Sequence, residues 1–327
     1  MSETVRITLA EAMMRAEAVL VQAGTAKLTA AAVARALVLA EADGHSGHGL
    51  IRLASYAAQA KAGKIQGYAK PSLEVLRPAA CRVDAAGGFA YPALDLAVEW
   101  LLNAGPAQGI AVASIYRSCH CGAMGLVVER LARAGIVGLM VANTPAAMAP
   151  WGGRRPLFGT NPIACAFPFA EDPVVIDLSL SKVARGQILA AKRKGVPIPA
   201  GWALAPDGSP TTDPVQALAG TMVPAADAKG AALALMVEAM AAGLTGANFA
   251  ADASSFLDAE GEPSGTGQML IAIDPLACGG DPAHLSALFR EVAAESGARL
   301  PGLSRFALRR QAEAQGIAVD PGWFNAV

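Results

Sequence analysis

The chain has 327 residues, of which 54% are hydrophobic and 16% are charged, and its formal net charge is −1. This length allows two lobes of ordinary size. The interspersed charges form neither the basic surface that nucleic acids require nor a lysine and arginine cluster for an anionic membrane. We therefore expect a tightly packed enzyme without nucleic-acid or membrane partners.

The cell compartment is indicated by what the sequence lacks. No apolar run reaches the roughly 18 residues of a membrane span, and the N-terminus has no recognisable export signal. The five cysteines are an odd number without the spacing of a disulfide framework, which fits a reducing environment. We expect a cytoplasmic protein.

The first predicted elements are helices. Thr8-Leu9-Ala10-Glu11 has the form of a capping box that opens a helix. Gly24 is expected to end this helix, and Thr29 to begin a second one that runs to about residue 41. Residues 50–61 are predicted to form a third helix.

From residue 81 onward, strand and helix patterns alternate. Predicted strands cover residues 81–84, 109–115, 136–142, 163–167, 174–178 and 269–273. Predicted helices cover residues 94–104, 125–134, 230–242, 282–296 and 304–315, and the last two are expected to fold back onto the N-terminal helices. This alternation predicts an α/β fold.

Several common site motifs are absent from the sequence. There is no G-x-G-x-x-G, no G-x-x-x-x-G-K-[ST], no G-x-S-x-G and no H-E-x-x-H. Their absence argues against a Rossmann or P-loop site, although the α/β pattern still allows nucleotide binding by another fold.

Three of the four histidines lie in two polar, glycine-flanked segments, residues 43–49 and 119–122. His48 and Arg52 are four residues apart, so both can project from one side of a helix. A guanidinium binds a carboxylate in a bidentate pair, and an imidazole with a pKa of about 6.5 transfers protons near neutrality. The pair suits a 2-oxo, 2-hydroxy or 2-imino acid. The alternative is a helix-capping histidine and a solvated arginine.

The second histidine segment is Cys119-His120-Cys121-Gly122. Side chains alternate along such a triplet, so its three side chains cannot easily bind the same ion, and we predict no metal site. The other interpretation is a loop after a strand, in which Gly122 and Gly125 permit close backbone approach and His120 faces a cleft.

Polar residues also mark the ends of predicted strands. Thr160 and Asn161 directly precede a buried strand, where α/β proteins often hold ligands, although such segments are often only turns. Asp177, Ser179 and Ser181 occupy alternate positions and should face the same way.

Two of these polar groups have open alternatives. Asp177 is expected either to orient the His48 imidazole or to cap the next segment. Lys229, at the start of an apolar helix, is either a solvated lysine or a cation for a cofactor phosphate or ribose.

Together these segments resemble the type-2 malate/L-lactate dehydrogenase family over nearly the whole chain. The matching motifs are Gly47-His48-Gly49-Leu50-Ile51-Arg52 for Ser-His-Gly-x-x-Arg, His120-Cys121-Gly122 for His-Phe-Gly, Pro150 to Gly153, Gly159 to Pro162, Asp177 to Ser181, Lys229-Gly230 and Arg299 to Gly302. Within the family, Glu41-x-Asp43-Gly44 and Arg305 are most similar to the Δ1-piperideine-2-carboxylate/Δ1-pyrroline-2-carboxylate reductases.

The resemblance implies a fold and an assembly. The expected fold is a non-Rossmann, sulfolactate-dehydrogenase-like α/β fold with a mixed sheet, helices and a mainly helical lobe from the two chain ends. Residues 1–115 with 295–327 would form a substrate and dimerisation lobe, and residues 116–294 a nicotinamide-cofactor-binding lobe. The resemblance also implies a homodimer.

The implied reaction is hydride transfer between a nicotinamide and C2 of a small carboxylate substrate. His48 would exchange the proton with support from Asp177, and Ser46, Arg52 and Thr160 would bind the substrate. The residues expected to line the cofactor are His120, Gly122, Ala123, Ile176, Asp177, Leu178, Ser179, Ser181, Lys229, Gly302, Ser304 and Arg305. NADP(H) is expected rather than NAD(H), with Arg305 positioned to meet the 2′-phosphate.

Two residues depart from the family pattern. Gly47 replaces the serine before the catalytic histidine, which removes a hydroxyl that Ser46 is placed to substitute. Cys121 replaces an aromatic residue, which is expected to widen the pocket near the nicotinamide.

We predict reduction of a cyclic 2-imino acid, with a 2-hydroxy acid dehydrogenase of the malate, lactate or ureidoglycolate type as the alternative. A metal-dependent hydrolase and a non-catalytic ligand-binding homologue are the alternatives from other classes.

Overall fold

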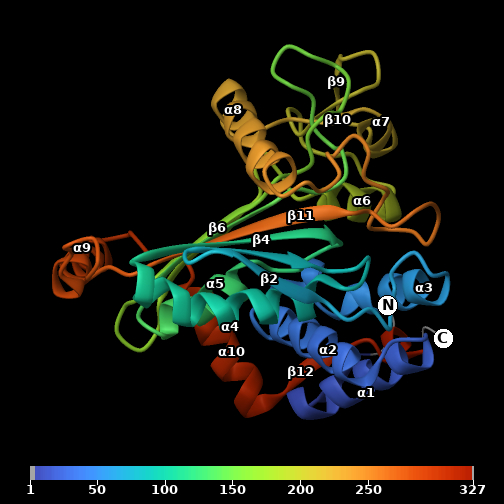
Figure 1. Ribbon diagram of the computed structural model, residues 1–327. Helices are drawn as coiled ribbons and strands as arrows, with labels where there is room; N and C mark the ends of the chain where they lie inside the picture. Colours follow the sequence, from blue (N-terminus) through green and yellow to red (C-terminus); the bar gives the residue numbers. More distant parts are fainter. Residues whose placement is uncertain (1–3, 326–327) are drawn as a thin grey trace.

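The computed structural model describes residues 4–325 and centres on a seven-stranded sheet (Figure 1). In spatial order its strands are β2 (Ser72–Arg77), β3 (Ala80–Asp84), β4 (Ile110–Ser118), β11 (Thr266–Ile273), β5 (Val137–Ala142), β6 (Ile163–Phe167) and β7 (Val174–Leu178). β3 and β4 are parallel, and all other neighbours are antiparallel. The predicted mixed sheet is confirmed.

Helices cover one side of the sheet in two layers. The inner layer is α4 (Ala90–Gln108) and α5 (Gly125–Arg133), and the outer layer is α1 (Leu9–Gln22), α2 (Lys27–Ala42), α3 (Leu53–Lys61) and α10 (Leu303–Gln315). The short strands β1 (Val5–Ile7) and β12 (Ile317–Val319) pair antiparallel, which joins the two ends of the chain. The helical layer therefore combines both chain ends, as predicted.

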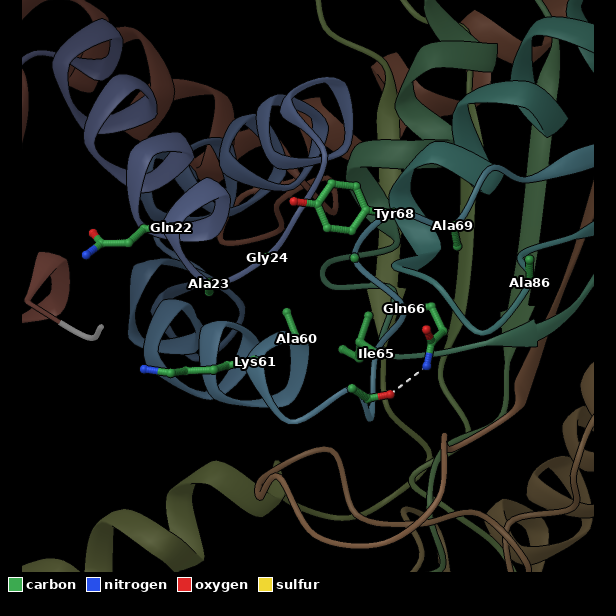
Figure 2. Close-up of a pocket in the computed structure, with 12 residues that line it drawn as sticks. Gln22, Ala23, Gly24, Ala60, Lys61, Ile65, Gln66, Tyr68, Ala69 and Ala86 are labelled. Atoms are coloured by element: carbon green, nitrogen blue, oxygen red, sulfur yellow. Dashed lines mark hydrogen bonds between the residues drawn. The ribbon is translucent and has the colours of Figure 1, made fainter.

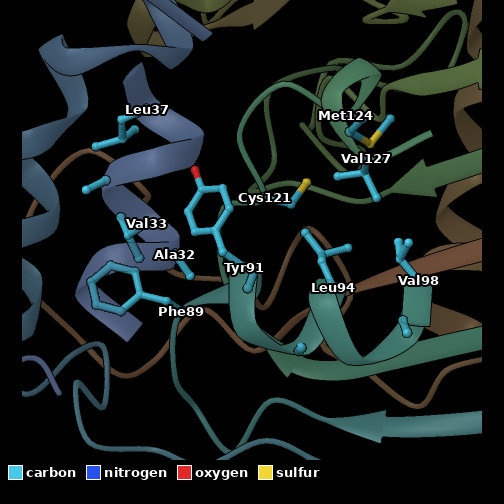
Figure 3. Close-up of a cluster of buried hydrophobic side chains, with 14 of the residues drawn as sticks. Ala32, Val33, Leu37, Phe89, Tyr91, Leu94, Val98, Cys121, Met124 and Val127 are labelled. Carbon is cyan, nitrogen blue, oxygen red and sulfur yellow. The ribbon is translucent and has the colours of Figure 1, made fainter. Parts of the chain in front are cut away.

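Small apolar side chains let these helices approach closely. Figure 3 shows Ala32 and Val33 of α2 next to Tyr91 of α4, and all three are buried. Interiors pack at crystal-like density, so alanine-rich helices of this kind can lie close together.

The opposite side of the sheet carries a second layer. It consists of α8 (Asp227–Glu238), a π-helical segment (Ala239–Gly243), α6 (Arg185–Lys194), α7 (Pro214–Ala219) and a small sheet of β8 (Ala203–Leu204), β9 (Pro210–Thr211) and β10 (Thr221–Met222). The sequence analysis predicted α8 but none of the smaller elements.

α9 (Pro282–Ala294) departs from the expectation that both C-terminal helices return to the N-terminal ones. It lies at the far edge of the molecule in Figure 1. The ring of its Phe289 lies 5.8 Å from that of Phe167, the last residue of β6, and 5.4 Å from that of Phe169, as measured between ring centroids. Of these two helices, α10 is the one that packs against α2.

The predicted element boundaries hold best where local chemistry fixes them. β6 and β7 have the predicted bounds, and the Thr8 side chain caps α1 by accepting a hydrogen bond from the Glu11 N–H. The predicted N-cap at Thr29 is wrong, because α2 begins at Lys27 after Ala26, whose N–H donates to the Gly67 carbonyl.

The predicted helix over residues 50–61 is broken at its start. Two 3₁₀ turns, η1 (Ser46–His48) and η2 (Leu50–Arg52), precede α3, and the extended backbone of Gly49 separates them. A last 3₁₀ turn, η4 (Pro321–Phe324), lies near the C-terminus.

The predicted division into lobes crosses this sheet. β4 runs through the boundary between residues 115 and 116, and the same sheet continues into both parts, with β2 and β3 on one side of β4 and β11, β5, β6 and β7 on the other. Within residues 4–325, no helix combines the length and the hydropathy needed to cross a membrane.

Candidate functional site

The fold brings the two histidine segments together. His48 lies on η1, directly after α2, and His120 lies in the loop that follows β4. Their rings are stacked, with centroids 5.3 Å apart and planes inclined by 10°. We call His48 and His120 the imidazole pair.

Both members of the imidazole pair are uncharged near neutral pH. Burial, with smaller contributions from the charges of Arg52 and His45, lowers the pKa of His48 to about 4. Burial holds the pKa of His120 well below its usual value, and the charges of Arg52 and His48 act in the same direction. An uncharged imidazole can accept a proton, so the pair is prepared to remove one from a substrate.

Arg52 is held close to the imidazole pair with part of its guanidinium free. Its Nε donates to the Gly47 carbonyl at 2.7 Å. The two terminal nitrogens make no hydrogen bond to any residue in the described range 4–325, and the side chain is half-buried. The geometry therefore leaves the bidentate edge available to a carboxylate.

Two tyrosines that the sequence analysis did not select support His120. The Tyr56 hydroxyl lies 2.5 Å from His120 Nδ1 and 3.0 Å from the Tyr91 hydroxyl, and both tyrosines are buried. Tyr56 follows Arg52 by four residues, so helical spacing was a signal that could have identified it.

A loop from the distant part of the chain completes the surroundings of His120. The Phe256 ring lies 5.3 Å from the His120 ring, inclined by 59°. Gln59 donates to the Phe256 carbonyl at 3.0 Å, and the buried Lys64 ammonium donates to the Ser255 carbonyl at 2.7 Å. No local pattern in the sequence indicates this contact.

Asp177 does not contact His48 in this structure. Its carboxylate accepts a hydrogen bond of 2.7 Å from the N–H of Gly125, the first residue of α5, where the helix dipole favours negative charge. His48 Nδ1 is buried and has no hydrogen-bond partner among the described residues. Asp177 thus bonds the start of α5, which precedes it in the chain, and the hydrogen bonds of the described residues include neither the predicted one to His48 nor a cap on the following segment.

The pKa of Asp177 is raised by its burial. The Gly125 hydrogen bond and the positive charges of His45 and Arg305 act in the opposite direction. Asp177 therefore lies within electrostatic range of His45, although its carboxylate is hydrogen-bonded to the Gly125 N–H.

Arg305 has a different environment from the one predicted. It is 5% exposed, forms an ion pair with Glu129 and lies 3.4 Å from Asp43. Arg309 bonds both carboxylates, at 2.6 Å to Asp43 and 2.7 Å to Glu129. We call these four residues the ion-pair cluster.

The expectation that Arg305 meets a 2′-phosphate is corrected by the ion-pair cluster. Two carboxylates balance two guanidinium groups in the interior, and removing Arg305 from them would leave buried negative charge. Because Asp43 immediately follows α2, the cluster anchors the start of the segment that carries His48.

Glu41 likewise has a structural role. Its carboxylate accepts from the Leu50 N–H at 3.0 Å and lies so close to the Gly49 α-carbon that any larger residue would clash there. Burial raises the pKa of Glu41. Glu41 and Asp43 therefore hold both ends of the histidine segment.

Thr160 is placed beside β7 by backbone bonds. Its N–H donates to Thr144 Oγ1 at 2.9 Å, and its carbonyl accepts from the Leu180 N–H at 2.8 Å. The neighbouring Asn161 is fully buried and donates to Glu238, so it is part of the interior. None of these contacts joins Thr160 to Arg52.

The predicted cofactor residues along 176–181 differ in exposure. Ile176 is half-buried and Leu178 is exposed, while Ser181 is buried. The hydroxyls of Ser179 and Ser181 lie 3.2 Å apart. The expectation that these two side chains face the same way is therefore confirmed.

Other predicted cofactor residues lie at open backbone positions. Lys229 is exposed on the first turn of α8, a helix whose N-cap has no side-chain hydrogen bond. Ser304 is exposed, and Gly302 has a φ of +87° with its α-carbon against the Val175 backbone. A cation and hydroxyls are donors that a dinucleotide requires, so these residues fit such a group.

Gly122 and Ala123 are both buried. Gly122 has a φ of +70°, and a Cβ there would lie 2.6 Å from the Tyr91 hydroxyl. The close approach predicted for Gly122 is thus made by a tyrosine of the protein itself.

The two departures from the family pattern have different consequences. Cys121 is 6% exposed in the core between Tyr91 and Met124 (Figure 3), and its effect on the width of the nicotinamide pocket stays a prediction. Gly47 is exposed, and a Cβ at this position would meet nothing within 4 Å. The serine hydroxyl is therefore missing from an open position.

One cavity is lined by other residues than this site. It has a volume of about 680 Å³ and is lined by residues such as Gln22, Lys61 and Tyr68 (Figure 2), with none of the predicted site residues. Within the described part of the chain, no three histidine, cysteine, aspartate or glutamate residues are grouped to hold a metal ion.

An uncharged imidazole pair beside a partly free arginine, in a mixed α/β fold without a Rossmann fingerprint, is an arrangement that can bind a small carboxylate and exchange a proton with it. Comparison with known proteins agrees with this arrangement. The malate/L-lactate dehydrogenase family matches residues 7–327. The chain belongs to this family and is an NAD(P)-dependent oxidoreductase.

Two similar relatives and one solved structure carry different substrate names. A (2R)-3-sulfolactate dehydrogenase (NADP(+)) of Chromohalobacter salexigens is 50% identical over 93% of this chain and 92% of its own. A Δ1-pyrroline-2-carboxylate reductase of Ancylobacter novellus is 38% identical over 99% and 97%. The Δ1-piperideine-2-carboxylate reductase structure from Pseudomonas syringae has a TM-score of 0.92 at 35% identity, with 98% of each chain covered. The predicted fold class is confirmed.

Proposed function

We propose that this enzyme oxidises a small 2-hydroxy acid, and reduces the matching 2-oxo acid, with the imidazole pair as its proton-transfer group. The observation that carries this proposal is the pKa of His48, which at about 4 leaves the ring uncharged at neutral pH. A base of this kind removes the proton of a C2 hydroxyl as the hydride leaves C2.

Arg52 has the complementary role of binding the substrate carboxylate. Its Nε is already fixed by the Gly47 carbonyl, so the remaining donors keep one orientation. Holding the carboxylate in this way positions C2 and its hydroxyl next to the imidazole pair. Ser46, Thr160 and Asp177 remain proposed contributors to substrate binding and to the support of His48.

A bound nicotinamide cofactor supplies or accepts the hydride. We propose that Lys229 binds a phosphate, that Ser179 and Ser181 bind ribose hydroxyls, and that His120, Gly122, Ala123, Ile176, Leu178, Gly302 and Ser304 line the rest. We keep the preference for NADP(H), which is supported by the name of the relative at 50% identity and no longer by Arg305.

The sequence analysis placed cyclic imine reduction first, and it stays the second candidate. The residues that favoured it, Glu41, Asp43 and Arg305, bond to the protein itself in this structure. The relative at 50% identity is named for a 2-hydroxy acid, whereas the Δ1-pyrroline-2-carboxylate reductase is 38% identical. The more similar relative favours the hydroxy acid.

The test is an optical assay of each cofactor with each substrate. NADP⁺ and NAD⁺ would be reduced with (2R)-3-sulfolactate, malate and lactate, and NADPH and NADH oxidised with the two cyclic imines. Preferred turnover of a hydroxy acid supports the proposal, and turnover of the imines alone overturns it in favour of the second candidate. Absence of turnover with every pair overturns both.

We also propose a homodimer and the division into a substrate and dimerisation lobe (1–115 with 295–327) and a cofactor lobe (116–294). Support for self-association comes from α8 in the cofactor lobe, where Leu233, Leu235 and Met236 are exposed. A helix with apolar residues on all sides is normally covered. Light scattering on the eluting protein would give twice the chain mass, and a single chain mass would contradict the dimer.

For the location we propose the cytoplasm. The five cysteines are all free, and the pKa values of the buried Cys119 and Cys121 thiols are raised to about 12 by burial. Fractionation of cells that express the chain would test this, and recovery outside the cytoplasm would contradict it.

A further inference from the structure

His120 is surrounded by three rings, but only one of its nitrogens has a hydrogen-bond partner. His48 stacks on it, Phe256 packs against it, and the Tyr56 hydroxyl lies 2.5 Å from Nδ1. Nε2 makes no hydrogen bond to any residue in the described range. The direction of the bond to Tyr56 therefore decides which nitrogen carries the proton.

The protons of the neighbouring tyrosines determine this direction. Tyr91, Tyr56 and His120 form a chain of hydrogen bonds, and Tyr56 is the only hydrogen-bond partner of the Tyr91 hydroxyl among the described residues. If Nδ1 donated to Tyr56, then Tyr56 would donate to Tyr91. The Tyr91 proton would be left in the interior without an acceptor.

In the opposite direction both hydroxyl protons have acceptors, and the ring proton lies on Nε2, which is not among the buried unpartnered atoms of the described residues. Tyr91 donates to Tyr56, and Tyr56 donates to His120 Nδ1. Buried donors are almost always paired because an unpaired one loses its bonds to water without replacement. The second arrangement is therefore the stable one, and it leaves the ring proton on Nε2.

We propose that Tyr56 is a positioning residue that holds His120 as the uncharged Nε2–H tautomer, so that Nε2 donates a hydrogen bond to the C2 oxygen of the bound substrate. The contact with substrate rests on the proposed function, whereas the tautomer does not. His48 then exchanges the proton of the same C2 substituent, and Tyr91 fixes the hydroxyl of Tyr56.

Local charge agrees with an uncharged His120. Arg52 and His48 both oppose a second positive charge at this ring, and burial opposes it more strongly. The Tyr56 hydroxyl is itself held protonated, because burial raises its pKa well above the usual value. Tyr56 can therefore act as a donor across the working pH range.

The tautomer can be measured without any substrate. The full chain would be labelled with ¹⁵N-histidine, and the His120 resonances identified by their loss in His120→Gln. We expect an unprotonated Nδ1 and a protonated Nε2 at neutral pH. A protonated Nδ1 in the unmodified protein would overturn the proposal, whether or not any variant folds.

Matched tyrosine variants separate the role of Tyr56 from simple packing. Tyr56→Phe should produce a mixture of both His120 tautomers, while Tyr91→Phe should keep Nε2–H because Tyr56 still donates to Nδ1. Tyr116→Phe removes a hydroxyl that bonds Asp84 and should change nothing. An unchanged His120 spectrum in Tyr56→Phe would show that Tyr56 does not set the tautomer.

Kinetics test the contact with substrate. Tyr56→Phe should lower kcat by about 10-fold for the best substrate of the panel, with KM changed by less than about threefold. A change confined to KM would overturn the assigned contact. If no substrate of the panel turns over, the proposed function fails, and the tautomer result still stands.

Discussion

Two groups of buried titratable side chains lie at the two ends of the same short segment, and they are stabilised in opposite ways. The ion-pair cluster at Asp43 matches two carboxylates with two guanidinium groups. The imidazole pair at His48 has no counter-charge and an unpartnered Nδ1. The ion-pair cluster keeps its charges because each has an opposite charge beside it, whereas the two rings of the imidazole pair stay uncharged.

The difference separates anchoring from chemistry. A buried charge that is fully paired resists any change of protonation, because removing one partner leaves the other uncompensated. A buried imidazole without a partner can bind and release a proton when a substrate arrives. Within about six residues, the chain thus places a fixed group next to a reactive one.

The largest expected effect comes from removing the reactive group. His48→Asn should lower turnover by about 10²- to 10⁴-fold, because this is the usual contribution of a positioned acid or base. The free energy of unfolding should change little, since His48 lacks a bond to lose. Steady-state rates and urea unfolding would be measured together, and a near-normal rate would remove His48 from the reaction.

Breaking the ion-pair cluster should mainly lower the free energy of unfolding. Glu129→Gln leaves Arg305 and Arg309 with a single carboxylate and should destabilise the fold by about 3–5 kcal/mol. Urea unfolding gives the loss of free energy. A loss below about 1 kcal/mol would mean that the ion-pair cluster does not anchor the segment.

The imidazole pair and the ion-pair cluster should lose their contributions to stability in different pH ranges. The pKa of His48 is about 4 when folded and about 6.5 when unfolded, so between these values the unfolded state binds more protons. Stability contributed by the uncharged ring is therefore lost as pH falls through this window, by up to about 1.4 kcal/mol per pH unit for each such group.

Glu129 of the ion-pair cluster responds at lower pH. Burial alone would raise the pKa of Glu129, but its bonds to Arg309 and the charge of Arg305 lower it overall. Its stabilisation is lost only as pH falls below the unfolded pKa of about 4.3. Unfolding curves of His48→Asn should therefore be flatter above this pH and unchanged in slope below it.

Restoring the family serine tests the open side of the imidazole pair. Gly47→Ser places its side chain where nothing lies within 4 Å, so stability should change by less than about 0.5 kcal/mol. A new hydrogen bond to substrate would lower KM by about 2- to 10-fold. Equal KM values for all substrates of the panel would show that the hydroxyl does not reach them.

The smallest effect is expected from an exposed ion pair on the same helix as the cluster. Arg310 bonds Asp172 at 2.7 Å, but its side chain is 60% exposed. Arg310→Ala should cost less than about 1 kcal/mol in urea unfolding, because water screens such pairs. A loss as large as that of Glu129→Gln would show that burial is not what distinguishes the cluster.

The sequence by itself determined the features that depend on neighbours along the chain. The Thr8 capping box and the bounds of β6 and β7 follow from residues within one element. The spacing of His48 and Arg52 indicated a site for carboxylates, and the order of the motifs indicated the family that the comparisons show. Each of these is a local pattern, which periodicity and composition record directly.

Only the tertiary structure decided which partners the site residues meet. Arg305 was expected at a phosphate and lies between Asp43 and Glu129, because a guanidinium binds carboxylates and phosphates equally well. Asp177 caps α5 instead of touching His48. The contacts of His120 with His48 and Phe256 join segments far apart in the chain. Such partners are determined by how the helices and strands pack together, and they cannot be deduced from a residue's type or from its neighbours in the sequence.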